Sequence, residues 1–339
     1  MESRRNLFIG CAGVFLAVAA AGLAIGGRPE PARMTRAGLR SHGHVRIHRQ
    51  RAAASWDSEN WGGYAISGAS GAGLPDGSVT EVKGSWKVPA ISACPSSGSA
   101  DADAYSSFWT GMDGWASNSE TVEQIGTDSD CVSLDGTKTD TPTYYAWYEF
   151  YPQNSYVIEF PKGCSSPAEA KDTVRVGTTP TTCVEPGDTI SAEVTWSNGS
   201  SSLRAGPGHA SASEGTFALK LTDVTRNWTF TETASLRGAR ESSAEWITEA
   251  PCCTNSGGFL PLADFSSVGY GDYYTKVADT SWATISGNTA PLGSFGSDIQ
   301  DITIVNETTS APMAYPSVLL TDALGNPSNF NMTWESVGP

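Results

Sequence analysis

The sequence predicts an all-β fold, and a β-sandwich in a single domain is the simplest account of it. From about residue 55 onward, short runs rich in β-branched and aromatic residues alternate with clusters of Gly, Ser, Asn, Asp and Pro. No long stretch has a helical period, and no internal repeat occurs. The 339 residues include 36 Gly, 19 Pro and only 17% charged residues, a composition poor in the Glu, Lys and Leu of amphipathic helices.

Each expected strand is a β-rich run bounded by turn-forming residues. In chain order the strands are expected at 61–66, 79–88, 105–111, 121–126, 144–151, 189–196, 216–223, 227–233, 244–249, 299–305 and 329–334. The Pro-rich stretches 161–167 and 311–316 are expected to be surface loops and not linkers between domains.

One of these runs carries a carboxylate among aromatic rings. Alternate residues of a strand share a face. In the run 144–151 the odd-numbered side chains lie on one side: Tyr145, Trp147, Glu149 and Tyr151. This mixture favours a substrate groove, and a half-exposed aromatic ladder is the structural alternative. The same alternation places Trp109 on one face with Asp113, and Gln124 on one face with Asp128, unless the glycines between them form bulges.

Charge is distributed unevenly along the chain. The formal net charge is −15, but residues 1–51 hold nine Lys and Arg against two acids. Residues 52–339 therefore keep 12 basic and 34 acidic residues, a net charge of −22. Binding phosphates needs a basic surface, so nucleic acid is excluded as a partner. So many carboxylates repel one another at neutral pH and relax as they protonate near their usual pKa of about 4. A protein that works in acid would carry such a surface. A surface selected for solubility or for a salty habitat is the alternative explanation.

Two segments at the start of the chain are expected to be removed. Residues 1–27 join Arg4 and Arg5 to an uncharged run rich in Ala and Gly that ends in small residues, which is the pattern of a secretory signal peptide. An uncleaved membrane anchor is the alternative, since the run approaches the ~20 residues of a span. Removal of the signal predicts a secreted, extracellular protein with no membrane contact.

Residues 28–54 form a basic leader ahead of the predicted domain 55–339. The leader holds seven Arg, one Glu and three of the four histidines of the protein, which are His42, His44 and His48. We expect a propeptide that docks on the acidic domain by charge and is released when carboxylates of that domain protonate. A disordered basic leader with no inhibitory role is the alternative.

Six of the seven cysteines follow the leader. An even count in an exported chain predicts disulfides. The pairs that we expect are Cys94 with Cys131 and Cys164 with Cys183. Adjacent Cys252 and Cys253 then form either a vicinal bridge or two crossed bridges. No Cys-x-x-Cys spacing occurs, so no metal site is expected.

The patterns of the common hydrolases are missing. The sequence has no Gly-x-Ser-x-Gly, Ser-x-x-Lys or His-Glu-x-x-His, and neither Asp-Thr-Gly nor Asp-Ser-Gly of pepsin-like proteases. Beyond the leader the only histidine is His209, on a Gly/Pro-rich loop. Hydrolysis can instead use a carboxylate that takes a proton from water and a neutral donor that stabilises the oxyanion. Glycosidases and acid peptidases both remain open on this ground, and neither needs a cofactor.

Seven short segments decide between these classes. They are 60–63 (NWGG), 84–89 (GSWKVP), 109–114 (WTGMDG), 123–128 (EQIGTD), 146–152 (AWYEFYP), 244–249 (AEWITE) and 259–265 (FLPLADF). Together and in this order they resemble the glutamic peptidase family, the eqolisins. The resemblance implies a β-sandwich of two antiparallel sheets whose concave face binds a peptide, and endopeptidase activity in acid. The chain departs from the commoner pattern of the family at Thr110, Met112 and Phe150 and in its leader. These departures bear on the substrate preference more than on the activity.

The resemblance also implies a catalytic glutamine and glutamate, which fall on Gln124 and Glu249. We expect Glu249, as a carboxylate, to activate water and then protonate the leaving nitrogen, while Gln124 orients the water and donates an N–H to the oxyanion. Supporting or substrate-binding roles are expected for Trp61, Trp109, Asp113, Asp128, Trp147, Glu149 and Tyr151. We expect a monomer that acts on protein or peptide substrates and loses structure or activity toward neutral pH, because clustered carboxyls stay protonated in acid.

Two rival functions remain at this stage. A glycoside hydrolase or lectin on a similar sandwich would use Glu149 with a second acid and stack its tryptophans on sugar. It gives no reason for Gln124 and Glu249 to occur in these segments. A secreted adhesion or binding protein without catalysis is the third reading, and tight ligand binding without turnover would support it.

Overall fold

The computed structural model describes residues 42–94, 103–116, 119–132, 138–171, 181–198, 215–252, 258–271, 281–322 and 325–338. All of them belong to the unit Met34–Pro339. The predicted signal peptide, most of the leader, His209 and Cys253 lie outside the described residues. In the described ranges, no helix has the length and apolar character that a membrane crossing requires.

The described residues form twenty strands and one 3-10 helix, Leu292–Asp298. The strands are β1 (Ile47–Ala52), β2 (Ser55–Ser58), β3 (Trp61–Ile66), β4 (Val79–Lys87), β5 (Ser107–Met112), β6 (Val122–Val132), β7 (Lys138–Tyr151), β8 (Tyr156–Glu159), β9 (Glu169–Lys171), β10 (Thr189–Asn198), β11 (Gly215–Asp223), β12 (Trp228–Ala234), β13 (Ala244–Glu249), β14 (Ser267–Tyr270), β15 (Trp282–Ile285), β16 (Asn288–Pro291), β17 (Ile299–Val305), β18 (Pro312–Pro316), β19 (Leu320–Thr321) and β20 (Pro327–Trp334).

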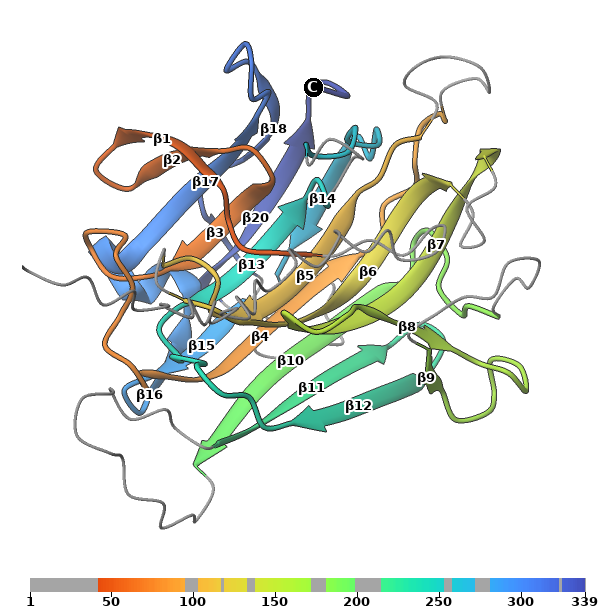
Figure 1. The fold of residues 1–339 in the computed structure, drawn as a ribbon, viewed down its shortest axis with the longest axis horizontal. Coiled ribbons are helices and arrows are strands. Elements are labelled where there is room, and N and C mark those ends of the chain that lie inside the picture. Colours follow the sequence, from red (N-terminus) through yellow and green to blue (C-terminus); the bar gives the residue numbers. More distant parts are fainter. Residues whose placement is uncertain are drawn as a thin grey trace, which may run out of the picture. The chain divides into compact units, whose positions relative to one another are not determined.

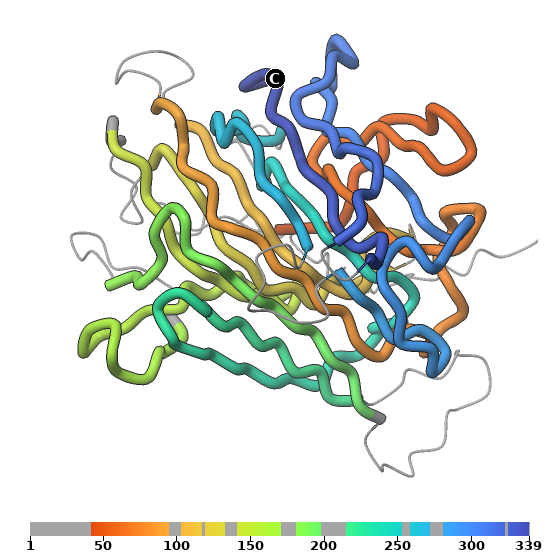
Figure 2. The backbone as a smooth tube through the Cα atoms, turned by 180° about the vertical axis from the view of Figure 1, so that it is seen from behind, coloured from red at the N-terminus to blue at the C-terminus, as the bar shows by residue number. Residues whose placement is uncertain are grey.

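Hydrogen bonds join these strands into one network, in which every strand pair is antiparallel except β2 with β17. The front run has the order β9, β8, β7, β6, β5, β13, β3 and β17 (Figure 1). The back run has the order β12, β11, β10 and β4, followed by β14 and β20 (Figure 2). Strand β18 pairs with both β17 and β20 and so connects the two runs.

The all-β prediction is confirmed, and each of the eleven expected runs overlaps a strand. Two separate sheets are not shown, because β18 continues the hydrogen bonding from one run to the other. The expectation of a loop at 311–316 is wrong, since β18 lies there. Its prolines, Pro312 and Pro316, stand at the two ends of the strand, where a missing N–H costs the ladder least.

The two runs face each other across the main apolar core. This core takes buried side chains from strands of both runs, among them β4, β10 and β11 at the back and β5, β7 and β13 at the front. Two indoles also bridge the runs through hydrogen bonds. Trp86 of β4 donates to the hydroxyl of Thr127 on β6 at 2.9 Å, and Trp246 of β13 donates to the carbonyl of Lys83 on β4 at 2.7 Å. These contacts hold the front run in a fixed position over the back run.

The other side of the front run carries a second, aromatic cluster. In β7, Tyr148 and Phe150 pack into the main core, whereas Tyr145 and Trp147 pack into this second cluster, as strand alternation predicts. Further members are Trp61, Ala65, Trp109, Trp115, Val122, Val157, Ile247 and Ile302. We call this side of β5, β6, β7 and β13 the aromatic face.

Both expected disulfides are present. Cys94 and Cys131 have their Cα atoms 5.3 Å apart and tie the segment after β4 to the end of β6. Cys164 and Cys183 have theirs 5.5 Å apart. Cys252 is disulfide-bonded as well, and its pairing with Cys253 stays a prediction.

The end of the basic leader forms a hairpin that the sequence did not predict. Strand β1 pairs with β2, and β2 pairs in parallel with β17 (Figure 1). Asp57 accepts ion pairs from Arg49 at 2.6 Å and from Arg51 at 2.8 Å, and Arg51 also reaches Asp301 at 2.9 Å. These partners lie far along the chain or across a turn, so a local pattern of charge and hydropathy does not reveal them.

Candidate active site

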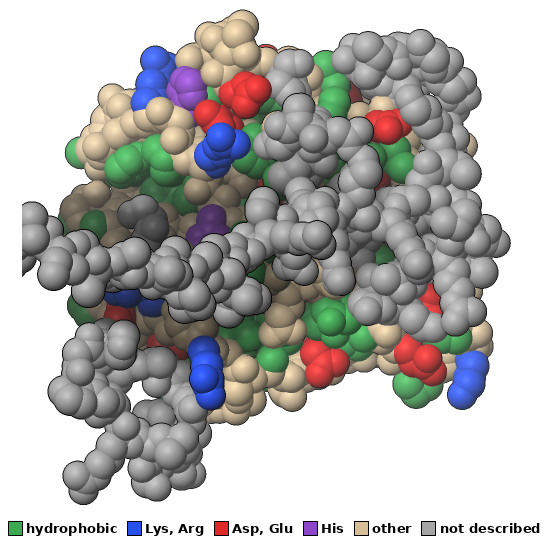
Figure 3. Space-filling model, viewed as in Figure 1, with side chains coloured by type: hydrophobic (Ala, Val, Ile, Leu, Met, Phe, Trp, Pro, Cys, Tyr) green, Lys and Arg blue, Asp and Glu red, His purple; other side chains and the backbone are tan. Residues whose placement is uncertain are grey.

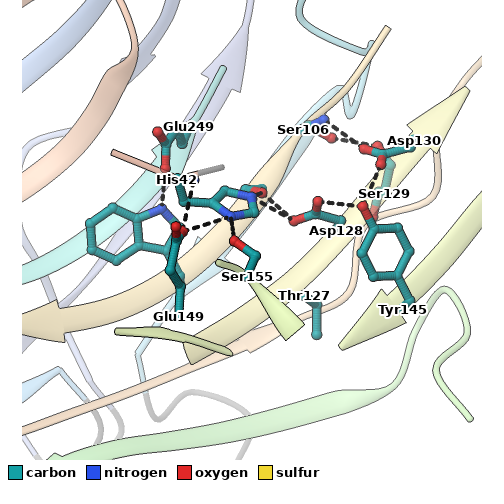
Figure 4. A network of polar contacts seen from close by, with 12 residues as sticks. His42, Ser106, Thr127, Asp128, Ser129, Asp130, Tyr145, Glu149, Ser155 and Glu249 are labelled. Carbon is teal, nitrogen blue, oxygen red and sulfur yellow. Dashed lines mark hydrogen bonds and ion pairs between the residues drawn. The ribbon is translucent and has the colours of Figure 1, made fainter. Parts of the chain in front are cut away.

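Four neighbouring strands bring the predicted site residues together on the aromatic face. In the strand register, Gln124 lies opposite Glu149, and Ser107 lies opposite both Asp128 and Glu249. All five side chains are buried. Residues opposite each other in antiparallel strands point to the same face, so these groups converge. Figure 4 shows three of them, Asp128, Glu149 and Glu249, around the side chain of His42. The predicted pair, Gln124 and Glu249, thus lies in one buried polar cluster.

Tryptophan side chains position the carboxyl of Glu249. The indole N–H of Trp109 donates to Glu249 Oε2 at 2.8 Å. Trp61 packs edge-on against Trp109, with 4.8 Å between ring centroids. On the neighbouring strand, Gly126 leaves room for this arrangement, since a Cβ there would lie 2.6 Å from Cβ of Trp109. Trp61 and Trp109 therefore act on Glu249 by packing and by one hydrogen bond.

The carboxyl of Glu249 keeps its proton up to a higher pH than an ordinary glutamate does. Burial raises the pKa of Glu249 to about 8, because the charged form loses its water. The positive charge of His42 and the hydrogen bond from Trp109 work against this shift. The carboxylates of Glu149 and Asp128 add to it. In this state of the chain Glu249 is neutral throughout the acid range.

Gln124 contacts the main chain of the leader. Its side-chain N–H donates to the backbone carbonyl of His42 and, at 3.4 Å, to Glu149 Oε2. The amide oxygen of Gln124 has no hydrogen-bond partner among the described residues. A buried amide therefore presents a donor to a peptide carbonyl and keeps an acceptor free.

His42 fills the centre of the site, and sequence reasoning missed it there. Its imidazole stacks on Trp147, with 3.7 Å between ring centroids and an interplanar angle of 3°. Nε2 lies 2.7 Å from Ser107 Oγ, and Nδ1 lies 3.3 Å from Ser155 Oγ. The backbone N–H of His42 donates to Glu149 Oε2 at 2.8 Å. Figure 3 shows this side of the molecule, where acidic, basic and apolar side chains surround a hollow of the surface.

Two carboxylates keep the imidazole of His42 charged. Its Nε2 lies 3.5 Å from Asp128 Oδ1, and its Nδ1 lies 3.6 Å from Glu149 Oε2. Burial lowers the pKa of His42, but Asp128 and Glu149 outweigh burial, so the pKa rises to about 10. His42 is therefore an imidazolium at every pH at which the protein is expected to work.

Asp128 is held by further hydrogen bonds. It accepts one from Ser107 Oγ, and the hydroxyl of Tyr145 lies 2.8 Å from a carboxylate oxygen of both Asp128 and Asp130. One hydroxyl carries one hydrogen, so both contacts can be hydrogen bonds only when one carboxyl keeps its proton. Burial and the charge of Asp128 raise the pKa of Asp130 well above its usual range, so Asp130 supplies that proton.

Two predicted supporting residues lie farther from Gln124 and Glu249. Asp113, at a positive φ of 67°, accepts backbone N–H bonds of 2.8, 2.8 and 2.9 Å from residues 240–242. It therefore fixes the segment that enters β13. Tyr151 is half-buried and meets the ring of His44 edge-on, with 4.9 Å between centroids. Tyr151 thus contacts the leader beside the site.

Asn60 is a further site residue that sequence reasoning missed. Its side-chain N–H lies 3.5 Å from Glu249 Oε1 and donates to the carbonyl of His44 at 3.0 Å, and its Oδ1 accepts from the N–H of Arg46 at 2.8 Å. Asn60 opens the segment NWGG, which was singled out only for its resemblance. The leader backbone after His42 therefore runs beside the carboxyl of Glu249.

Within the part of the chain that the structure describes, no three His, Cys, Asp or Glu side chains form a group that could hold a metal ion. A neutral amide contacts a peptide carbonyl, and a buried carboxyl lies beside the same stretch of main chain.

Comparison with known proteins gives a consistent result. The model of the Peptidase A4 family matches residues 59–179 and 175–311. The structure is similar to scytalido-glutamic peptidase in complex with a transition state analog inhibitor, with a TM-score of 0.50 and 20% identity over 82% of this chain and 98% of that chain. It is also similar to aspergilloglutamic peptidase from Aspergillus niger, with a TM-score of 0.41 and 20% identity over 68% and 99% of the two chains. No curated protein matches the sequence.

The family model covers well over half of the chain and includes the segments that carry Gln124 and Glu249. It therefore confirms the resemblance read from the seven short segments, and it makes the chain a peptidase with peptide substrates. The chain belongs to the Peptidase A4 family, the glutamic peptidases or eqolisins.

Proposed function

We propose that the protein is a secreted endopeptidase that hydrolyses peptide bonds in acid, with Glu249 acting on water and Gln124 stabilising the oxyanion. One observation carries the proposal. The side-chain amide of Gln124 donates to a peptide carbonyl, that of His42, while Asn60 contacts both Glu249 and the carbonyl two residues further along. A peptide carbonyl and a buried carboxyl are thus held next to each other, as hydrolysis requires.

The proposed reaction needs only these two side chains and a water molecule. Glu249, as a carboxylate, takes a proton from water, and the water oxygen adds to the carbonyl carbon. The N–H of Gln124 stabilises the negative charge that develops on the carbonyl oxygen, and its free Oε1 accepts a hydrogen bond from the water. Glu249 then gives the proton to the leaving nitrogen, and the C–N bond breaks.

Glu249 must lose its proton before it can act as a base. With the leader in place, burial holds the pKa of Glu249 at about 8. Departure of the leader admits water, which lowers that pKa, and removes the charge of His42, which raises it. Burial is the largest cause of the shift, so the pKa falls overall. We therefore propose that the leader both blocks the site and keeps the base protonated.

We propose that residues 1–27 are a signal peptide and that residues 28–54 are a propeptide of a zymogen. The disulfides Cys94–Cys131 and Cys164–Cys183 support an oxidising compartment. Ion pairs of the leader with domain carboxylates support release in acid, as with Arg46 and Glu59 at 3.0 Å. We further propose that the front and back runs work as the two sheets of a sandwich, with the aromatic face as its concave substrate surface. A carbohydrate-active function is set aside, since the family is one of peptidases.

Cleavage of an unfolded protein by the acid-treated, secreted chain tests this function. At about pH 3 to 4, where ordinary carboxyls begin to protonate, we expect proteolysis that persists with pepstatin, a chelator and a serine reagent. Glu249 and Gln124 offer none of these inhibitors a target. No cleavage by folded protein that has lost its leader would contradict the proposal, as would inhibition by any of the three reagents.

A further inference from the structure

We propose that Asp128, Trp147 and Glu149 form a subsite for a protonated histidine on the acyl side of the cleaved bond, and that His42–Gly43 is a bond which the leader-free enzyme cleaves in other copies of the chain. This inference rests on the proposed function and adds a substrate class to it. It concerns which peptides enter the site, whereas the proposed function concerns how the bond is broken.

The backbone contacts of His42 fix its place relative to the reaction. Its carbonyl oxygen accepts the hydrogen bond of the Gln124 amide, which is the proposed oxyanion donor. The carbonyl that binds an oxyanion donor is the one that water attacks. The attacked carbonyl therefore belongs to His42, and the bond that breaks is the one between His42 and Gly43. The side chain of His42 then marks the subsite on the acyl side.

Each partner of the ring selects a different property of histidine. Trp147 stacks on it at 3.7 Å, which favours a flat ring. Ser107 donates its only hydrogen to Asp128, so its oxygen accepts from Nε2–H of the ring at 2.7 Å. Nδ1 lies 3.3 Å from Ser155 Oγ and 3.6 Å from Glu149 Oε2, and both oxygens can accept its hydrogen. Both ring nitrogens thus face acceptors, and only the imidazolium carries a hydrogen on each.

Complete burial makes this subsite discriminating. His42, Asp128 and Glu149 are all 0% exposed. An apolar ring such as phenylalanine would satisfy Trp147 but would leave two buried carboxylates without their cation, which is costly in a dry site. A neutral amide side chain would supply hydrogen bonds without the charge. Histidine meets all the requirements at acid pH.

The chain beyond His42 is held as the leaving side of a substrate would be. The carbonyl of His44 accepts from Asn60 at 3.0 Å, and the N–H of Val45 donates to the carbonyl of Gly114 at 3.2 Å. At Gly43 a Cβ would have one near neighbour among the described residues, Tyr151 at 3.7 Å, so a small side chain fits there. Together with the backbone hydrogen bonds of His42, these bonds hold the segment on both sides of the proposed scissile bond.

Cleavage of this bond by a leader-free copy of the enzyme consumes one water molecule. Water oxygen bonds to the carbonyl carbon of His42, and the bond from that carbon to the nitrogen of Gly43 breaks. The products are a carboxyl group on His42 and an amine on Gly43, which becomes the new N-terminus. The proton that water loses reaches the amine through Glu249.

Two measurements on the wild-type protein test the proposal. Mass spectrometry of the full chain after acidification is expected to find a fragment that ends at His42 and a chain that begins at Gly43. Peptides with the sequence of residues 37–48 are then compared with versions carrying His42→Phe or His42→Gln. We expect kcat/KM for the bond before Gly43 to be at least about 10-fold higher for the histidine peptide, because a buried polar site rejects ligands that leave it unpaired.

Variants of the enzyme show which residues set the preference. Asp128→Asn is expected to reduce the ratio of the histidine to the phenylalanine peptide, whereas Glu307→Gln, at an exposed position, keeps it. The ratio does not depend on how much of the variant folds. Equal cleavage of the peptides, or acid processing that leaves His42–Gly43 intact, overturns the subsite while the proposed function stands. If the leader-free enzyme cleaves neither the peptides nor an unfolded protein, the proposed function itself fails.

Discussion

Replacing Glu249 by glutamine is expected to lower kcat/KM for an unfolded protein by at least about 1000-fold. Loss of one essential catalytic residue lowers the rate about as much as loss of all the residues that act with it. Glutamine has nearly the same shape, and its Oε1 can still accept the 2.8 Å hydrogen bond from Trp109. The fold should therefore survive while the chemistry stops. Activity within a few-fold of wild type would refute the role of Glu249.

This experiment needs chain from which the leader has been removed, because His42 fills the site in the intact protein. Glu249→Gln chain should remain at full length after acidification and lose its leader when a trace of wild-type enzyme is added. Glu307→Gln makes the same chemical change at an exposed position and is expected to process and cleave as wild type does. Thermal unfolding and near-UV circular dichroism confirm that both variants are folded.

The fold is expected to lose stability as the pH rises from the acid range toward neutrality. Glu123 of β6 and Glu245 of β13 are buried, and none of their carboxyl oxygens has a hydrogen-bond partner among the described residues. Burial raises the pKa of both well above the usual range, and the charge of Asp113 adds to the shift. Both groups are therefore protonated in the folded state and ionised in the unfolded state once the pH exceeds the usual value.

The sign of the effect follows from proton linkage. A carboxyl whose pKa is raised by folding binds its proton more tightly in the native state. Its contribution to stability is complete below the unfolded pKa and is lost as the pH rises through the folded pKa. Between these two limits each such group costs about 1.4 kcal/mol of unfolding free energy per pH unit. Glu249, with a pKa of about 8, adds to this loss in the intact chain.

Urea unfolding at a series of pH values measures this dependence. The double change Glu123→Gln and Glu245→Gln mimics the protonated groups and is expected to move the loss of stability to higher pH, while Glu307→Gln leaves it where it is in wild type. An unfolding free energy that stays constant or increases between about pH 4 and 7 would contradict the assignment, because raised carboxyl pKa values only allow a decrease.

Local sequence patterns predicted the parts of the structure that depend on local geometry. The alternation in 144–151 separates Tyr145 and Trp147 from Tyr148 and Phe150, and the two sets do pack on opposite faces. The even number of cysteines predicted disulfides, and both pairs that we expected are present. Gln124 was placed by its family resemblance, and the structure brings it together with Glu249.

What the sequence did not predict depends on contacts between distant residues. His42 lies 82 positions from Gln124 and 107 from Glu149, so no window of the sequence relates them. The neutral state of Glu123 and Glu245 depends on burial away from water. From the sequence alone, a glutamate is expected to be a charged residue at the surface. Strand β18, which connects the two runs, was not predicted, because its prolines indicated a loop. The three histidines of the leader were visible in the sequence, but only the contacts of His42 in the structure show what one of them does.

The central claim is that the neutral amide of Gln124 stabilises the oxyanion of a peptide bond, and the most direct test is the turnover of one defined peptide bond by Gln124→Ala and Gln124→Glu. The account predicts that Gln124→Ala lowers kcat about 100- to 1000-fold with a much smaller change in KM, as for other oxyanion donors. Gln124→Glu should also lose most activity, because it adds a titrating carboxyl beside Glu149. A kcat close to wild type in Gln124→Ala would contradict the account.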